Sequence, residues 1–501
     1  MLLSELLKGI EYTVKGGVDV GNTSIDWIYC DSRKITLDSL FVCIRGALSD
    51  GHNYVSQAYE FGCRVFVVER FVDTLPSDAV QIKTKDTRVA LAKISDAFFG
   101  HPSKGLQIIG ITGTKGKTTT AQLIYQTMNQ AGINCAYIGT SGVMYNDVIK
   151  PSLNTTPESY DLHYYMRKMV DGGVKVLAME VSSQALYQSR VYGIKFDVCV
   201  FTNLYRGDHV GNSEHPSFEH YRDCKASLFR DYGAECIVYN ADDEFADYMV
   251  KGTGTLLRSF GIKNDADFVG SDIALYRDEG ILGVKFTCKT GRGDIPITLN
   301  VPGDFSVYNA LCAMSVCDYF GISPIFSAKV LENVLIKGRF EVVSALPYCT
   351  FVIDYAHNGN SLRAVLGALA QYSPNRKICL FGSVGGRTRL RRRELGKAAA
   401  ELADLAIITS DNPDFESPEA IVDEIASYFG EGSCPYVKIP DRVEAIKYAV
   451  REAKEGDIVL FAGKGHEDYQ LICGEKVPFS EKEIILSESA KILEENMIPQ
   501  A

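Results

Sequence analysis

The sequence predicts an α/β protein of three domains. From about residue 105 onward, short apolar runs alternate with helical patterns, which is typical of parallel strands joined by helices. The runs are continuously rich in Val, Ile and Leu, as expected of strands buried on both faces. A chain of 501 residues also has room for about two to four domains.

The first predicted domain covers residues 1–104. It mixes short apolar runs such as "SLFVCIRG" and "CRVFVVE" with turn residues. It ends in "FFGHPSKG", where Pro and Gly are typical of a linker.

The second predicted domain covers residues 105–337. Its expected strands are "LQIIGIT", "NCAYIGT", "VKVLAMEV", "FDVCVFTNL" and "ECIVYN". Over residues 274–303 the apolar period shortens toward alternation, which favours antiparallel strands.

The third predicted domain covers residues 338–501. Its expected strands are "TFVIDYAH", "KICLFGSV", "LAIITSDNP" and "DIVLFAGKGHE". Each apolar run ends in polar or charged residues, and the carboxyl edge of an open α/β sheet is where ligands bind.

Composition excludes several classes of function. The net charge of −11 gives no general attraction to nucleic acid or to an anionic membrane. No apolar run approaches the ~20 residues of a membrane helix, and the first residues lack the pattern of a signal peptide. The fourteen cysteines contain no C-x-x-C pair and are typical of reduced thiols in a cytoplasmic protein.

An anion site is predicted where one strand passes into a helix, at Gly113, Thr114, Lys115, Gly116, Lys117 and Thr118. Backbone N–H groups and the helix dipole form a phosphate cradle in this context. Lys117 would reach the outer phosphates and the Thr118 hydroxyl would complete a magnesium shell. Two residues separate the glycines where the common phosphate loop has four, and a tight turn with solvated lysines is the alternative.

Two further side chains follow neighbouring predicted strands. Glu180 ends a buried strand, where a carboxylate is costly without a partner, and His209 follows the next strand. Both are candidates for the magnesium site, although a lone Glu and a lone His are more often structural or surface residues.

The order of several short motifs resembles that of the Mur ligases, the ATP-dependent enzymes that build the peptide of peptidoglycan precursors. The motifs are "GTKGKT", "EVSS", "TNL" followed by "DH", "GRFE", "DYAH", "DNP" and "GKGHE". The segments "DSR", "LFVCIRGALSDGHNYV" and "NTTPES" look most like the members that add the third residue. The resemblance spans about residues 30–470.

The resemblance implies a small N-terminal α/β domain that binds UDP, a central P-loop ATPase-like domain with a parallel sheet, and a C-terminal Rossmann-like domain that binds an amino acid. It implies an amide ligase that activates the carboxylate of UDP-N-acetylmuramoyl-L-alanyl-D-glutamate with ATP. An acyl phosphate forms, and a free amino acid attacks it. The enzyme is expected to be a cytoplasmic monomer without nucleic-acid partners or membrane insertion.

The resemblance also assigns the nucleotide and metal residues. The ATP residues are Gly113 to Thr119 together with Asn309, Arg339, Asp354 and His357. Thr118, Glu180 and His209 fall at positions associated with Mg²⁺. Lys225 matches a lysine that carbon dioxide carbamoylates in this family, which converts a cation into an anionic ligand for a second magnesium. Lys117, Glu180, His209 and Lys225 are therefore the expected catalytic residues.

Substrate residues follow from the same resemblance. The UDP end is assigned to Ser32, Ala47, Leu48 and Ser49. The muramoyl-dipeptide is assigned to Asn154, Thr155, Thr156, Ser182, Gln188 and Arg190. The incoming amino acid is assigned to Arg387, Asp411, Asn412, Pro413, Asp414, Gly463 and Glu467. Turn and cap roles are the alternative for the hydroxyl residues.

The third residue is expected to be L-lysine or a similar diamino acid. Ligases for meso-diaminopimelate usually read D-N-P-R, and this chain has Asp414 in place of that arginine. Asp414 and Glu467 would attract an ammonium group, whereas a carboxylate would be repelled. Diaminopimelate is the alternative, in which an arginine among residues 389–393 replaces the missing arginine and pairs with the substrate's second carboxylate.

Other positions depart from the family pattern at Gln184, Ser306 and Thr388, and the segment after "DH" is unusual. These departures leave open a catalytically weak paralogue that acts as a binding or regulatory partner. A folylpolyglutamate-type or cyanophycin-type ligase and a P-loop motor or switch are further alternatives. The "DSR" and "DGHNY" segments argue against a folate ligase, which needs no UDP-binding module.

Overall fold

The computed structural model describes residues 1–17, 19–46, 49–206, 210, 214–278, 280–386 and 389–497. The chain divides into two compact units: unit 1 is Met1–Asp267 with Cys312–Ile322, and unit 2 is Phe268–Leu311 with Ser323–Ala501. No helix among the described residues is long and apolar enough to cross a membrane.

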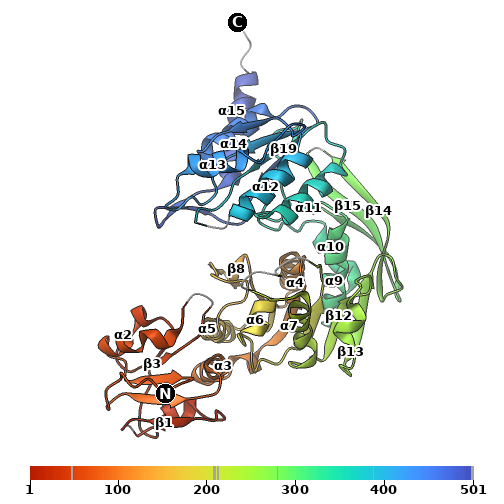
Figure 1. Ribbon diagram of the computed structural model, residues 1–501. Coiled ribbons are helices and arrows are strands. Elements are labelled where there is room, and N and C mark those ends of the chain that lie inside the picture. Colours follow the sequence, from red (N-terminus) through yellow and green to blue (C-terminus); the bar gives the residue numbers. More distant parts are fainter. Residues whose placement is uncertain are drawn as a thin grey trace. The chain divides into compact units, whose positions relative to one another are not determined.

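The first sheet lies in unit 1 near the N-terminus (Figure 1). Its spatial order is β1 (Thr13–Lys15), β5 (Val80–Lys83), β4 (Val65–Val68), β3 (Ser39–Val42) and β2 (Trp27–Tyr29). Strands β2 to β5 pair in parallel, and β1 is antiparallel to β5. The helical segments here are α1 (Leu3–Leu6), η1 (Ser32–Lys34), η2 (Gly51–Tyr54), α2 (Val55–Glu60), α3 (Thr87–Phe98) and η3 (Pro102–Gly105).

A second sheet of unit 1 is mainly parallel. Its spatial order is β13 (Leu256–Gly261), β12 (Cys236–Asn240), β11 (Val198–Phe201), β6 (Gln107–Thr112), β10 (Val176–Glu180), β7 (Cys135–Gly139), β8 (Gly142–Tyr145) and β9 (Val148–Lys150). Among these described strands the antiparallel pairs are β7–β8 and β8–β9, and the others are parallel. The parallel arrangement predicted from the apolar runs is confirmed.

Helices cover this sheet because the strands are apolar on both faces. They are α4 (Lys117–Gln130), α5 (Ser159–Asp171), α6 (Ser183–Tyr187), α7 (Phe218–Arg230) and α8 (Ala246–Val250). Met166 of α5 and Leu228 of α7 join Ile108 and Leu177 of the sheet in one buried cluster. Full burial of one such side chain contributes about 1.5–3 kcal/mol. Helix α3 of the first sheet packs beside α5 (Figure 1).

Unit 2 begins with antiparallel strands, as the alternating pattern predicts. They are β14 (Phe268–Asp278), β15 (Ile281–Thr290) and β16 (Gly293–Leu299), and β15 pairs with both of the others. Helix α9 (Phe305–Tyr319) starts in unit 2 and ends in unit 1, and α10 (Pro324–Leu331) follows.

The C-terminal sheet of unit 2 is parallel except for its first strand. Its spatial order is β17 (Glu341–Val343), β18 (Thr350–Asp354), β22 (Ile458–Ala462), β19 (Lys377–Phe381), β20 (Leu405–Ile408) and β21 (Tyr436–Lys438). A separate hairpin is formed by β23 (Tyr469–Ile472) and β24 (Glu475–Pro478). Because β18 and β22 are neighbours, "DYAH" and "GKGHE" lie side by side at one edge.

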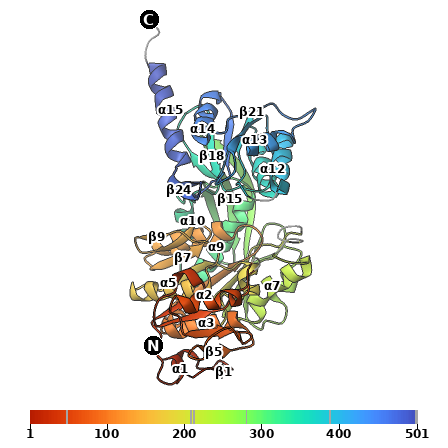
Figure 2. The same cartoon turned by 60° about the vertical axis from the view of Figure 1, so that its left-hand side comes forward.

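Helices lie on both faces of this sheet. Figure 2 shows α12 (Arg389–Leu402) and α13 (Pro418–Ala426) on one side of β18, with α14 (Arg442–Glu452) and α15 (Glu481–Met497) on the other. Helix α11 (Gly359–Ala370) packs against α12. The apolar side of α14 contributes Ala445 and Ile446 to a buried cluster with Phe351 and Phe461.

Candidate active site

The loop between β6 and α4 has the geometry of an anion cradle. Gly113 has φ of 151° and Gly116, the residue before α4, has φ of 83°. A Cβ on Gly113 would lie 1.9 Å from the Thr202 hydroxyl oxygen, so only glycine fits there. The loop thus leads into the N-terminus of a long helix, a position where backbone N–H groups stabilise an anion.

Residues after β11 hold this loop in shape. The Asn203 carbonyl accepts from the Thr114 N–H at 2.9 Å, and the Asn203 side chain accepts from the Lys115 N–H at 2.8 Å. The Thr202 hydroxyl donates to the Lys115 carbonyl at 2.7 Å. The sequence singled out "TNL" only as part of a motif, and these contacts give Thr202 and Asn203 a structural role.

Two lysines converge on one carbonyl oxygen of the loop. Lys117 Nζ and Lys225 Nζ each lie 2.8 Å from the Gly113 carbonyl oxygen. Lys225 is buried in α7, and burial together with the charge of Lys117 holds its pKa well below the usual value. A lowered pKa favours the neutral amine, which is the nucleophilic form of lysine.

Glu180 is fully buried at the end of β10 and accepts several hydrogen bonds. The Tyr137 hydroxyl donates to Oε1 at 2.7 Å, the Thr140 N–H donates to Oε1 at 2.9 Å, and the Thr118 hydroxyl donates to Oε2 at 3.0 Å. These three donor groups are all neutral. A buried carboxylate beside a hydroxyl therefore fits a divalent cation that prefers oxygen ligands.

Four predicted site residues fall where the chain is not described. His209, Ala47, Leu48 and Arg387 lie outside the described residues, and so does the departure at Thr388. Thr119 lies in the first turn of α4, beside the loop.

The predicted sugar-peptide residues come together beside Glu180. The Thr156 hydroxyl donates to the Glu180 backbone carbonyl at 2.9 Å and accepts from the Ser182 N–H at 3.0 Å. Arg190 Nη1 donates to the Thr156 carbonyl at 2.9 Å, and Nη2 donates to Gln188 at 2.8 Å. Arg190 also pairs with Glu158 at 2.9 Å.

Further contacts in unit 1 involve Ser182 and the remaining predicted substrate residues. Ser182 caps α6, which is the common role of serine at such a position. Thr155 and Thr140 share a hydrogen bond at 3.1 Å, and the Asn154 carbonyl accepts from Ser152 at 2.6 Å. In the first sheet's domain, the Ser32 hydroxyl donates to Gln57 at 2.7 Å, and Ser49 is exposed.

In unit 2, the predicted nucleotide residues gather around Tyr355. The Arg339 guanidinium lies 4.9 Å from the Tyr355 ring centroid, and the His357 ring lies 4.7 Å from it. Asp354 accepts from the Phe340 N–H at 2.9 Å, which ties "GRFE" to β18. Asn309 is buried on a different element, α9. Tyr355 was not predicted as a site residue, and its ring lies beside Arg339, His357 and His466.

The predicted amino-acid residues form a buried charged cluster in unit 2. Lys464 Nζ donates to Glu467 and to Asn412, each at 2.8 Å, and lies 3.7 Å from Asp411. Burial raises the pKa of Asp411, and the charges of Arg442 and Lys464 oppose this shift. Gly463 follows β22 with φ of 113°, and a Cβ there would lie 3.0 Å from an Asp411 carboxylate oxygen. Pro413 is also buried here.

Asp414 stands apart from this cluster. It has φ of 53°, and its Oδ1 accepts from the Gly474 N–H at 2.8 Å. Its backbone N–H also donates to the Leu471 carbonyl at 2.9 Å. Asp414 thus fastens the β23–β24 hairpin.

Comparison with known proteins assigns all three regions to one family. The Mur ligase family catalytic domain matches residues 24–99, the Mur ligase middle domain matches residues 111–317, and the Mur ligase glutamate ligase domain matches residues 338–465. The three-domain α/β fold expected from the sequence is thereby confirmed, while its boundaries at residues 104 and 337 stay predictions.

Relatives cover nearly the whole chain. The UDP-N-acetylmuramoyl-L-alanyl-D-glutamate–2,6-diaminopimelate ligase of Caldanaerobacter subterraneus is 38% identical over 494 residues, which is 98% of this chain and 100% of that one. The ligase of the same name from Geobacillus thermodenitrificans is 39% identical over 472 residues, covering 93% and 94%. A solved structure of a ligase with this name has a TM-score of 0.67 at 26% identity and covers 98% of this chain and 99% of that one. The resemblance seen in the motifs is confirmed, and this chain belongs to the Mur ligase family.

Proposed function

We propose that this chain is the ligase that joins a third amino acid to UDP-N-acetylmuramoyl-L-alanyl-D-glutamate, with ATP converted to ADP and phosphate. The relatives carry this nucleotide-sugar dipeptide in their names. The observation that carries the proposal is the convergence of Lys117 and Lys225 on the phosphate loop, beside the buried carboxylate of Glu180.

The phosphate loop is suited to hold the outer phosphates of ATP. Lys117 bonds to the carbonyls of Gly113 and Thr114, and an incoming phosphate can replace these neutral acceptors with charged ones. The same lysine can neutralise charge as the substrate carboxylate attacks the γ-phosphate to form an acyl phosphate.

Thr118 and Glu180 would hold Mg²⁺, and His209 is the proposed additional ligand. When bound, Mg²⁺ would neutralise phosphate oxygens. Tyr137 and Thr140 fix the orientation of the Glu180 carboxylate, so removing either hydroxyl would loosen that ligand.

Lys225 is proposed to be carbamoylated. Its neutral amine would attack carbon dioxide, forming an N–C bond and releasing one proton to water, and the product is an anionic carbamate. Carbamoylation would place a negative charge at Lys225 opposite the positive charge of Lys117, so the repulsion that disfavours a protonated Lys225 would become an attraction. The carbamate oxygens could serve as ligands for a second magnesium ion.

The substrate groups are assigned around these residues. We propose that Thr155, Thr156 and Ser182 bind the muramoyl-dipeptide by their hydroxyls, with Asn154, Gln188 and Arg190. The UDP end is assigned to Ser32 and to residues 47–49. The adenosine side is assigned to Arg339, Asp354 and His357, with Asn309, and Tyr355 offers a ring for stacking.

For the third residue we propose 2,6-diaminopimelate, the amino acid named in the relatives, over the L-lysine expected from the sequence. Asp414 is the observation that favours L-lysine. However, its carboxylate bonds to the hairpin at Gly474, and the charge of Glu467 is met by Lys464. Both contacts weaken the argument that these two carboxylates attract an ammonium group. Arg387 is the proposed partner of the substrate carboxylate.

The two lysines provide the test of the reaction. Lys117→Ala and Lys225→Ala should each lower ADP release by about a hundredfold or more, because the first removes a charge that neutralises the reacting phosphate and the second removes the proposed carbamate ligand. Short carboxylic acids should restore part of the Lys225→Ala activity by supplying the missing oxygens. Lys251→Ala removes an exposed lysine of the same unit and should keep full activity.

Turnover of Lys225→Ala equal to that of the unchanged chain, in buffer depleted of carbon dioxide, would remove the carbamate from the mechanism. Equal turnover of Lys117→Ala would mean that ATP binds elsewhere.

The identity of the third residue is tested by kcat/KM for meso-diaminopimelate, L-lysine and L-ornithine on one preparation. Diaminopimelate should be preferred by about tenfold or more, as expected when a charged group of the substrate finds its partner. Asp414→Ala should then change the preference little, as should Asp423→Ala, which removes an exposed aspartate paired with Lys438. If the chain instead preferred L-lysine, and Asp414→Ala abolished that preference, Asp414 would attract the substrate's ammonium group as the sequence predicts.

A further inference from the structure

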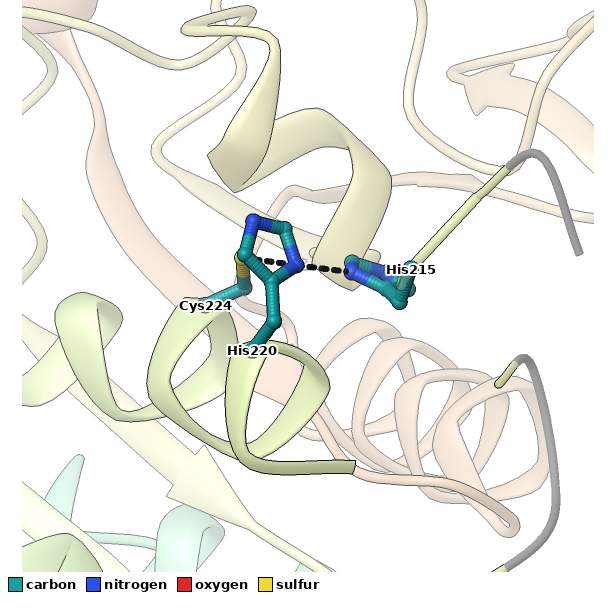
Figure 3. A group of neighbouring side chains, drawn as sticks. All are labelled: His215, His220 and Cys224. Carbon is teal, nitrogen blue, oxygen red and sulfur yellow. Dashed lines mark hydrogen bonds between the residues drawn. The ribbon is translucent and has the colours of Figure 1, made fainter. Parts of the chain in front are cut away.

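Three side chains with metal-binding atoms meet at the start of α7. His215, His220 and Cys224 each offer a ring nitrogen or a sulfur, and these atoms lie within 4.8 Å of one another. His215 is buried, while His220 and Cys224 are half-buried. Figure 3 shows His220 and Cys224 on one helix and His215 reaching them from the preceding segment.

The helix itself explains part of this arrangement. His220 and Cys224 are four residues apart in α7, so they lie on the same face one turn apart. A pair at this spacing can bind one ion from a rigid scaffold. The third ligand comes from outside the helix, which gives the three atoms the non-collinear arrangement that an ion needs.

The distances are close to those of a tetrahedral site. His215 Nδ1 and His220 Nδ1 lie 2.9 Å apart, and Cys224 Sγ lies 3.7 Å from His220 Nδ1. With Zn–N bonds of about 2.0–2.1 Å and a Zn–S bond of about 2.3 Å, tetrahedral geometry requires separations of about 3.4 Å and 3.6 Å. All three ligand atoms lie within 4.8 Å of one another, so side-chain rotations would bring them to these separations.

Surrounding groups fit a bound ion as well. The second nitrogen of His215, Nε2, lies 2.9 Å from the Ser183 hydroxyl oxygen, so an outer partner can fix the ring while Nδ1 faces the cluster. His220 and Cys224 also line a cavity of about 730 Å³ next to α6 and α7. Solvent can therefore reach the cluster and provide a fourth ligand.

We propose that His215, His220 and Cys224 form a binding site for a transition-metal ion of the zinc class. Two imidazoles and a thiolate select such an ion over Mg²⁺, which prefers oxygen ligands. The site is therefore chemically distinct from the oxygen-rich position at Thr118 and Glu180. The bound ion would link the segment before α7, which carries His215, to α7 itself, the helix that carries Lys225.

Cobalt is the probe, because a cobalt–thiolate bond gives an intense charge-transfer absorption that oxygen ligands do not give. The full chain is reduced, treated with a chelator, freed of the chelator and titrated with Co²⁺ in excess Mg²⁺, without ATP. We expect about one Co²⁺ per chain with a thiolate charge-transfer band, and Zn²⁺ should displace it.

Substitutions assign the band to these residues. Cys224→Ser should abolish the charge-transfer band, and His220→Gln should weaken Co²⁺ binding by about tenfold or more, since each loses one of three ligands. Two matched controls keep the band: Cys473→Ser removes an exposed cysteine, and His101→Gln removes a half-exposed histidine. Absence of the band in the unchanged chain, or its persistence in Cys224→Ser, would overturn the proposal.

A second measurement needs no substitution. Zn²⁺ should slow alkylation of Cys224 in the unchanged chain, as followed by mass spectrometry of the peptide that contains it, and leave alkylation of Cys473 unaffected. Equal alkylation rates of Cys224 with and without Zn²⁺ would contradict a site at this cysteine, even if the Cys224→Ser chain failed to fold.

Discussion

At the scale of single residues, burial decides what a charged group can do. Glu180 and Lys225 are both buried in unit 1, yet their surroundings differ. Glu180 accepts hydrogen bonds from hydroxyl and amide donors, which stabilise a carboxylate. Burial lowers the pKa of Lys225 and favours its neutral form, and the charge of Lys117 adds to this effect. These surroundings support the roles proposed above, a metal ligand for Glu180 and a nucleophile for Lys225.

A buried histidine outside the active site should make stability depend on pH. Burial lowers the pKa of His163 to about 4, although Asp96, 3.6 Å away, opposes the shift. Between about pH 6.5 and 4 the unfolded chain binds a proton that the folded chain does not, so stability falls as pH decreases. At pH 5 the loss is about 2 kcal/mol relative to pH 7, if the unfolded pKa is about 6.5.

His163→Leu should remove this loss, because leucine does not titrate. Urea unfolding at pH 7 and pH 5 measures the difference. His101→Gln removes the more exposed histidine bonded to Asp96 and is the control. It should keep most of the difference in stability between pH 7 and pH 5. If His163→Leu lost as much stability between pH 7 and pH 5 as the unchanged chain, other groups would cause the pH dependence.

At the scale of elements, the strand–loop–helix unit β6–α4 combines a packed core with an open loop. The strand supplies Ile109 and Ile111 to the interior, and the helix supplies Leu123 and Ile124. Their burial fixes the two ends of the loop, so the loop can keep glycines in left-handed conformations at residues 113 and 116. Packing on both sides therefore restricts the conformation of the loop.

Gly113→Ala should disable this unit. The added methyl would lie 1.9 Å from the Thr202 hydroxyl oxygen, so the loop must move away from its contacts with residues 202 and 203. ATP-dependent turnover should fall by about a hundredfold or more, since a displacement of about 1 Å is enough for such a loss.

Gly132→Ala is the matched control for backbone strain. Gly132 has φ of 80° just after α4, and no heavy atom lies within 4 Å of its added Cβ. It should cost about 1 kcal/mol of stability and leave turnover unchanged. Equal turnover of both variants would mean that the loop tolerates displacement.

At the scale of the whole molecule, the division into two compact units predicts two unfolding transitions. Each unit has its own buried cluster, with Leu228 in unit 1 and Phe351 in unit 2. Units with separate cores can unfold at different temperatures.

Arg442→Met should lower only the transition of unit 2. Arg442 is fully buried, and its guanidinium donates to Glu481 at 2.7 Å and to the Ala462 carbonyl at 2.8 Å. Its removal leaves a buried carboxylate unpaired, which costs about 3–5 kcal/mol. Differential scanning calorimetry measures both transitions. Arg363→Ala, which breaks an exposed pair with Glu401, should shift neither by much. A single unfolding transition whose midpoint shifts as a whole in Arg442→Met would contradict the division into two independently unfolding units.

Much of the architecture could be predicted from the sequence, because strands and the phosphate loop are local patterns. The apolar runs that end at Thr112, Glu180 and Phe201 indicated the parallel strands of unit 1. Short strands such as β8 and β21 were not predicted, since three or four residues carry too little periodicity. The family followed from the order of motifs along nearly the whole chain.

The sequence by itself therefore determined the fold class, the family and the strand–loop–helix unit around residues 113–118, all of which depend on residues close together in the chain. Only the tertiary structure decided which distant residues meet. Lys225 reaches the Gly113 carbonyl across 112 residues, and Tyr137 reaches Glu180 across 43. The cluster of His215, His220 and Cys224 also depends on how the segment before α7 returns to the helix. Such contacts arise from packing, because helices placed on a sheet bring together side chains that no spacing in the sequence connects.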